Sequence, residues 1–138
     1  MRILALDVGT KRIGVALSDE LLLTAQGQAT IERRSLEHDL AEIKRIIKEN
    51  NVEEAVVGLP LNMNGSYSAK TKEVVEFMDS LAKTAGVPVK AWDERLTTVQ
   101  AERALLEADI SRAKRKKVID KLAAQIILQS YLDSRKKG

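Results

Sequence analysis

The sequence predicts an α/β fold in which helices flank a mixed five-stranded β-sheet. Apolar runs and alternating patterns mark the strand candidates: residues 2–6, 14–17, 24–31, 55–57 and 87–92. The first three follow one another through short turns, which indicates a three-strand antiparallel meander. The last two alternate with helical patterns, over residues 36–50 and 69–85, which favours parallel strands joined by crossover helices. A final helical pattern begins near Lys117.

Local signals support the strands of the meander. Residues 2–6 are an uninterrupted apolar run, as in a buried strand, and the polar pair Lys11-Arg12 falls in the turn before the next strand. The third strand is the weakest, and Gly27 within it is a candidate bulge.

The helices have recognisable ends. Ser35 is a candidate cap for residues 36–50, where Leu36, Leu40, Ile43 and Ile47 share one face. Gly86 ends the helix of residues 69–85. Thr97 and Gln100 have the spacing of a capping box for a further helix to residue 108, followed by a polar loop over 109–117 and a frayed tail over 134–138.

Composition fits one soluble domain over residues 1–138. The chain has 44% hydrophobic residues and no cysteine, which excludes disulfides and thiolate metal sites. No window approaches the ~20 apolar residues of a membrane span, and no signal peptide is visible. We therefore expect a cytoplasmic protein without a membrane partner.

Positive charge is concentrated near the C-terminus. Residues 111–138 carry nine of the 23 Lys and Arg but two of the 20 Asp and Glu. Such clustering is typical of a surface that binds a polyanion such as nucleic acid. A solvated helix face followed by a basic tail would have the same composition, and both interpretations stay open.

Three acidic residues stand at positions that the fold could bring together. Asp7 closes the first strand, Glu94 follows the last strand beside Asp93, and Asp120 lies near the start of the final helix. The carboxyl ends of parallel strands meet at one edge of a sheet, where ligands usually bind. Close carboxylates repel unless a divalent cation joins them, which predicts a cation site, suited to Mg²⁺, that could serve phosphodiester chemistry. Each acid alone could instead be a turn cap or a surface charge.

Several basic and polar residues are candidates for phosphate contacts. Gly9 and Thr10 offer backbone N–H groups in a tight turn. The predicted substrate-binding residues are Thr10, Lys11, Arg12, Arg95, Arg112, Lys114, Arg115, Lys116 and Lys117. Tyr67 could stack on a base or simply be an exposed loop residue, and the single histidine, His38, is expected at the surface.

Four segments together resemble the RuvX family, also called YqgF. They begin at Asp7-Val-Gly-Thr, Gly58-Leu-Pro-Leu, Asp93-Glu-Arg-Leu and Asp120-Lys-Leu-Ala-Ala, in the family's order. The resemblance implies a ribonuclease H-like fold and a Mg²⁺- or Mn²⁺-dependent nuclease that processes the 5′ end of pre-16S rRNA in ribosome biogenesis. It also implies that Asp7, Glu94 and Asp120 are the catalytic, metal-binding acids. The related resolvase RuvC has more acids in its last helix than this chain.

Other functions remain open from the sequence. The chain could resolve Holliday junctions, which would require a dimer, or bind RNA without catalysis as a ribosome-assembly factor. We expect a monomer or a weak homodimer. A kinase of the actin and sugar-kinase group shares the Asp-x-Gly-Thr motif, but this chain lacks a second glycine-rich phosphate motif.

Overall fold

The computed structural model describes residues 1–96, the backbone of residues 112–136, and the side chains of that last segment from residue 122 to 135. The elements are β1 (Arg2–Val8), β2 (Arg12–Ser18), β3 (Ala25–Gly27), β4 (Ile31–Glu32), α1 (Leu36–Glu49), β5 (Val52–Leu59), α2 (Ala69–Thr84), β6 (Val89–Asp93) and α4 (Arg112–Lys136). The predicted helix over residues 97–108 lies outside the described residues.

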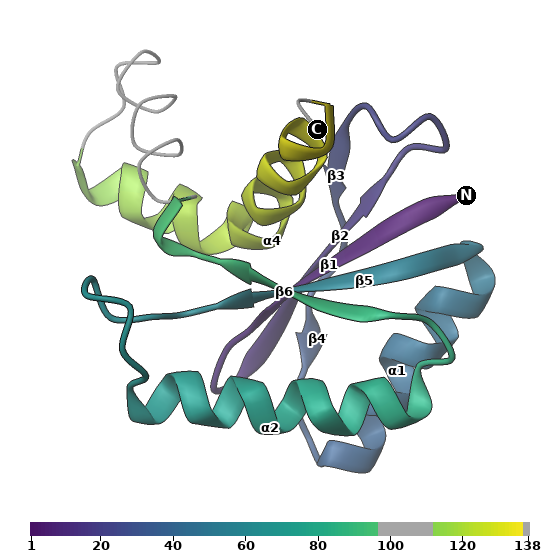
Figure 1. Cartoon of the computed structure of the whole chain (residues 1–138), viewed down its shortest axis with the longest axis horizontal. Helices are drawn as coiled ribbons and strands as arrows, with labels where there is room; N and C mark the ends of the chain where they lie inside the picture. Colours follow the sequence, from purple (N-terminus) through teal and green to yellow (C-terminus); the bar gives the residue numbers. More distant parts are fainter. Residues whose placement is uncertain (97–111, 137–138) are drawn as a thin grey trace.

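One mixed sheet organises the described part of the chain. Its order is β3-β2-β1-β5-β6, with β4 also paired to β2. β2 is antiparallel to β1, whereas β5 and β6 run parallel to β1, so the predicted meander and the two parallel strands are confirmed. The carboxyl ends of β1, β5 and β6 therefore lie at the same edge of the sheet (Figure 1).

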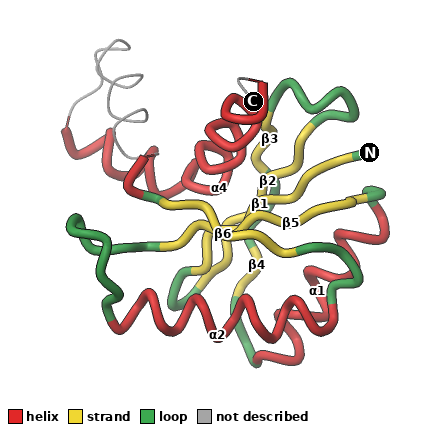
Figure 2. The backbone as a smooth tube through the Cα atoms, in the orientation of Figure 1, coloured by secondary structure: helices red, strands yellow, loops and turns green. Residues whose placement is uncertain are grey.

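Helices cover both faces of the sheet. α4 crosses one face and α1 and α2 lie along the other (Figures 1 and 2). The strand pleat divides the core accordingly: Ile3 and Ala5 of β1 pack toward α4 with Ile127 and Leu128, and Leu4 and Leu6 belong to the cluster on the opposite face. Asp7 continues the alternation of Ile3 and Ala5, which assigns it to the face covered by α4.

Both predicted helix starts on the α1–α2 face are capped. The Ser35 side chain accepts a hydrogen bond from the His38 backbone N–H, and Ser68 forms a reciprocal capping box with Thr71. Leu36, expected on the apolar face of α1, is 47% exposed instead. Asp39 is buried in that helix, together with Ile43 and Ile47.

Two predicted boundaries were wrong. The third strand is divided into β3 and β4, which pair with different parts of β2. Residues 28–30 belong to neither strand, although the Gln28 N–H still donates to the Val15 carbonyl of β2 at 2.8 Å. Residues 112–117, expected in a loop, are helical instead, because α4 spans Arg112–Lys136. The many Lys and Arg residues of that stretch suggested a solvated loop, but they are good helix formers. No helix in the described part of the chain is long and apolar enough to cross a membrane.

Candidate functional site

Asp7 and Glu94 approach each other across the middle strand of the parallel trio. Asp7 lies near the end of β1, and Glu94 follows β6, where its backbone N–H donates to the Leu59 carbonyl at 3.2 Å. A hydrogen bond links the two carboxyl groups. β5 separates their strands, so the Glu94 side chain must cross β5 to reach Asp7.

Gly58 provides the room for this crossing. A Cβ atom at Gly58 would lie 2.5 Å from the Glu94 Oε1 atom and 2.5 Å from the Ile127 Cδ1 atom of α4. Both distances are far below ordinary van der Waals contact, so a side chain here would displace the Glu94 carboxylate, the end of the Ile127 side chain, or both. Gly58 thus leaves the space that the Glu94 carboxyl group occupies.

The acid pair holds a proton unusually tightly. Burial, the negative charge of Asp7 and the hydrogen bond to Asp7 raise the pKa of Glu94 to about 8. The Lys70 ammonium group, in the first turn of α2, acts in the opposite direction. Two carboxyl groups in contact repel when both are ionised, and a divalent cation removes that repulsion. The donor set therefore suits a hard cation that prefers oxygen ligands.

The third predicted acid is located only by its backbone. Asp120 belongs to α4, one helical turn before Ala124. A Cβ atom at Gly14 would lie 3.5 Å from both the Ala124 Cβ and the Asp7 Cβ, so this helix face passes directly over the Asp7 region. The Asp120 side chain lies outside the described residues. Among the described side chains, no group of three or more Asp, Glu, His or Cys residues could hold a metal ion.

The turn between β1 and β2 carries three predicted phosphate contacts. The Gly9 N–H donates to the Arg12 carbonyl at 2.9 Å, and a Cβ at Gly9 would lie 2.6 Å from that oxygen, so the turn needs glycine there. Thr10 and Lys11 are exposed at the tip. The Arg12 guanidinium pairs with Glu32 at 2.9 Å, and both side chains are about two-thirds exposed (66% and 65%).

Sequence reasoning missed the residues that support this turn. The Arg33 guanidinium donates to the Gly9 carbonyl at 2.9 Å, pairs with Asp39 at 3.1 Å and lies over the Phe77 ring at 5.4 Å. Burial alone would raise the pKa of Asp39, but hydrogen bonds from His38, the Arg34 backbone and Arg33 hold it below its ordinary value. The sequence did contain one signal for this pair, because Asp39 has the helical spacing that places it on the same buried face as Ile43 and Ile47.

Arg95 has a different set of contacts from the phosphate contact predicted for it. Its Nη2 atom lies 2.6 Å from Asp93 Oδ2, and its Nη1 donates to the Met63 carbonyl at 3.0 Å. The hydrogen bond from Arg95 lowers the pKa of Asp93. Asp93 and Arg95 thus join the end of β6 to the loop after β5. The remaining predicted contacts, Arg112, Lys114, Arg115, Lys116 and Lys117, lie in α4 with side chains outside the described residues.

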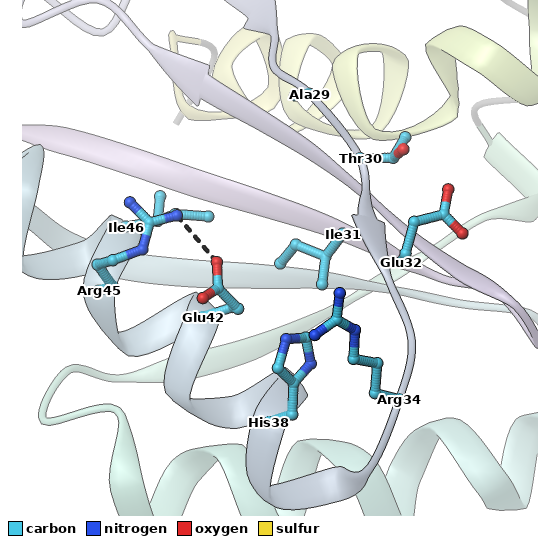
Figure 3. A pocket seen from close by; sticks show the side chains of 9 residues that line it. All are labelled: Ala29, Thr30, Ile31, Glu32, Arg34, His38, Glu42, Arg45 and Ile46. Atoms are coloured by element: carbon cyan, nitrogen blue, oxygen red, sulfur yellow. Dashed lines mark hydrogen bonds and ion pairs between the residues drawn. The ribbon is translucent and has the colours of Figure 1, made fainter.

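A separate hollow of about 390 Å³ lies between α1 and the strand edge at β4 (Figure 3). His38, Arg34 and Glu42 are among its lining side chains. Its acidic members are paired, Glu42 with Arg45 and Glu32 with Arg12, each at 2.9 Å. It contains neither Asp7 nor Glu94. Its acidic groups are already paired with arginines and His38 is hydrogen-bonded to Asp39, so the pair of Asp7 and Glu94 is the stronger candidate for chemistry.

Comparisons with known proteins identify the family of the chain. Residues 1–134 match the family model described as "RuvX: Holliday junction resolvase". A Symbiobacterium thermophilum protein named "Putative pre-16S rRNA nuclease" is 60% identical over 135 residues, covering 98% of this chain and 94% of that protein. A Halothermothrix orenii protein of the same name is 56% identical over 137 residues, covering 99% and 98%.

Solved structures share the fold at low sequence identity. Thermus thermophilus RuvC in complex with a Holliday junction substrate has a TM-score of 0.65 and 16% identity, covering 99% of this chain and 96% of RuvC. The fowlpox virus Holliday junction resolvase has a TM-score of 0.56 and 14% identity, covering 97% and 99%. These similarities confirm the expected ribonuclease H-like fold, and the matches over nearly the whole sequence show that the chain belongs to the RuvX family.

Proposed function

We propose that this chain is a divalent-metal-dependent nuclease that acts on structured nucleic acid and processes the 5′ end of pre-16S rRNA. The observation that carries the proposal is the hydrogen-bonded pair of Asp7 and Glu94 at the carboxyl edge of the sheet. The names of relatives at 60% and 56% identity supply the substrate class. RuvC, which shares the fold, was solved on a nucleic-acid substrate.

Asp7, Glu94 and Asp120 would hold Mg²⁺ or Mn²⁺. Asp7 and Glu94 would supply acceptor oxygens from two strand ends, and Asp120 would supply them from helix α4. A bound divalent cation lowers the pKa of a water molecule and stabilises the leaving oxygen of a phosphodiester. Glu94 must lose its proton before it can bind a cation, so metal loading of this site should release protons.

Other residues of the chain would orient the substrate. The exposed turn of Thr10, Lys11 and Arg12 offers N–H groups and positive charge to a phosphate next to Asp7. The basic stretch from Arg112 to Lys117 would hold the backbone further along the strand. Arg95 would contribute through its partners, because its contacts with Asp93 and Met63 fix the loop beside Glu94.

The decisive experiment is a cleavage assay on a pre-16S rRNA fragment with Mn²⁺, Mg²⁺ or EDTA. We expect cleavage with either metal and none in EDTA. Asp7→Asn and Asp120→Asn should each abolish cleavage and leave RNA binding largely intact, since they remove metal ligands and no phosphate contact. Glu76→Gln is the matched control, because Glu76 is an exposed acid on α2 and should keep full activity.

Two results would redirect the proposal. Faster cleavage of a four-way DNA junction than of the rRNA fragment, together with a dimeric native mass, would make the chain a junction resolvase. RNA binding without cleavage in any metal, and without a metal site by titration, would make it a non-catalytic assembly factor. Cleavage that survives Asp7→Asn would contradict the assignment of the acids.

A further inference from the structure

The loop between β5 and α2 exposes large apolar side chains at the same sheet edge as the acid pair. Met63 is 86% exposed and Tyr67 is 54% exposed, and Leu96, just after Glu94 and Arg95, is 59% exposed. In Figure 1 this loop projects from the edge where β5 and β6 end. Exposed apolar groups gathered beside a reactive site are a typical sign of a binding surface.

This loop is ordered by its own hydrogen bonds. Asn62 N–H donates to the Ser66 carbonyl at 3.0 Å, and Gly65 N–H donates to the Asn62 carbonyl at 2.8 Å. Gly65 adopts a φ of 86°, which favours glycine. Leu61 and Tyr67 form an isolated antiparallel bridge that closes the loop. Met63 and Tyr67 are therefore presented on a fixed backbone, although neither gains burial from it.

Arg95 connects the loop to the acid pair. Its Nη1 donates to the Met63 carbonyl at 3.0 Å, and its backbone directly follows Glu94. At the other end of the loop, Leu59 accepts the Glu94 backbone hydrogen bond. A ligand bound at Glu94 would thus lie beside the surface of this loop.

The loop differs in chemistry from the turn of Lys11 and Arg12 at the same edge. Residues 60–68 contain no charged side chain, so they cannot supply the ionic contacts that phosphates receive. An aromatic ring and a thioether suit a flat, polarisable partner instead. Nucleobases that are unpaired expose such faces, and they stack on aromatic side chains largely without regard to sequence.

We propose that Tyr67 and Met63 form a stacking surface for unpaired nucleobases of the substrate strand next to the scissile phosphate. This inference rests on the proposed nuclease function and adds a preference for single-stranded segments over continuous duplex. A paired base presents its faces only to its neighbours in the stack, so a duplex gains little from this surface. The backbone contacts of the basic residues would serve both substrates.

Binding in EDTA tests the surface without cleavage. The probes are a single-stranded RNA oligonucleotide containing 2-aminopurine and its full duplex, measured by anisotropy and by 2-aminopurine fluorescence. Tyr67→Ser should weaken single-strand binding by roughly 5- to 150-fold, the range given by the loss of one base–aromatic stack, and should leave duplex binding unchanged. The dependence of affinity on salt should not change, because Tyr67 carries no charge.

Matched variants separate stacking from a loss of folding. Leu21 is 75% exposed in the turn after β2, at the opposite edge of the sheet, and Leu21→Ser should have no effect on either probe. Tyr67→Trp, unlike Tyr67→Ser, should retain single-strand binding and should quench 2-aminopurine fluorescence at least as strongly as the unaltered protein does. Met63→Ser should weaken single-strand binding less than Tyr67→Ser does, because a thioether offers less stacking area than a ring.

Three results would overturn the stacking surface: equal effects of Tyr67→Ser and Leu21→Ser, equal losses for single strand and duplex, or a homodimer that Met63→Ser dissociates. The last would assign the apolar loop to contact between two copies of the chain. Cleavage by the unaltered protein with Mn²⁺ is scored separately. Absent cleavage with intact Tyr67-dependent binding would count against the nuclease and not against stacking.

Discussion

Glu94→Gln should flatten the pH dependence of stability in the metal-free protein. Burial and the neighbouring Asp7 carboxylate raise the pKa of Glu94 to about 8 from an ordinary value of 4.5. A glutamine keeps the shape and a hydrogen bond to Asp7, but it has no proton to lose. The variant therefore removes one titration and little else.

The sign of the effect follows from which state binds the proton more tightly. The folded state does so, since its pKa is the higher one, so the contribution of Glu94 is fully present below pH 4.5 and is lost as pH rises toward 8. The slope is about 1.4 kcal/mol per pH unit, which amounts to a loss on the order of 3 kcal/mol between the unfolded pKa and pH 7. Relative to the unaltered protein, Glu94→Gln should gain this amount over the same interval.

Urea unfolding in EDTA at pH 5, 6, 7 and 8 measures the difference directly. We expect the free energy of unfolding of Glu94→Gln, minus that of the unaltered protein, to increase steadily with pH. Glu76→Gln is the control, because an exposed acid on α2 should give a difference that does not change over this interval. If the difference in the free energy of unfolding between Glu94→Gln and the unaltered protein stays constant from pH 5 to 8, Glu94 does not hold its proton beside Asp7 in this interval. When Mn²⁺ replaces EDTA, the urea concentration at the unfolding midpoint should rise more for the unaltered protein than for Glu94→Gln.

Further predictions concern residues that position the site. Gly58→Ala should displace the Glu94 carboxyl group, weaken Mn²⁺ binding measured by calorimetry and reduce cleavage at least tenfold. Unchanged Mn²⁺ affinity would show that the position of the Glu94 carboxyl group does not depend on Gly58. Asp39→Asn should lower the free energy of unfolding in urea by about 2–4 kcal/mol, because Arg33 keeps its charge and loses a buried partner. A decrease below ~0.5 kcal/mol would show that the Arg33–Asp39 pair does not stabilise the fold. Tyr131→Phe should cost about 1–2 kcal/mol by the same measurement, since the Tyr131 hydroxyl donates to buried Glu54, and an unaltered midpoint would contradict that bond.

Local patterns were sufficient for the elements of the fold. Each predicted strand and helix within the described residues is present, because apolar runs and cap residues such as Ser35 are local signals. The division of the third strand could not be predicted. It depends on how two short segments pair with β2, and pairing is a tertiary property. The start of α4 was missed because a run of Lys and Arg is compatible with both a helix and a solvated loop.

The site was partly accessible to the same reasoning. The positions of Asp7 and Glu94 at strand ends predicted their proximity, and they share a hydrogen bond. The role of Asp120 stays a prediction. Arg33 and Asp39 could not be found as a pair, because their ion pair depends on how α1 packs against the β1–β2 turn. The partners of Arg95 also come from tertiary structure, since the Met63 carbonyl is distant in the chain.

Small residues explain why two acids so far apart in the sequence meet under a helix. Gly14 lies opposite Asp7 in the β1–β2 ladder and faces the Ala124 turn of α4. A Cβ atom at Gly14 would be in ordinary contact, at 3.5 Å, with the Ala124 Cβ and the Asp7 Cβ, so only a side chain larger than alanine would crowd the helix. Gly58 leaves the space in which the Glu94 carboxyl group and Ile127 both fit. Asp7 and Glu94 are partly buried on the sheet face that α4 covers, and burial is the largest cause of the raised pKa of Glu94. The helix that would bring Asp120 to the site therefore also makes the acid pair costly to ionise without a cation, and a residue larger than alanine at Gly14 should weaken both effects together, because it would push α4 away from Asp7.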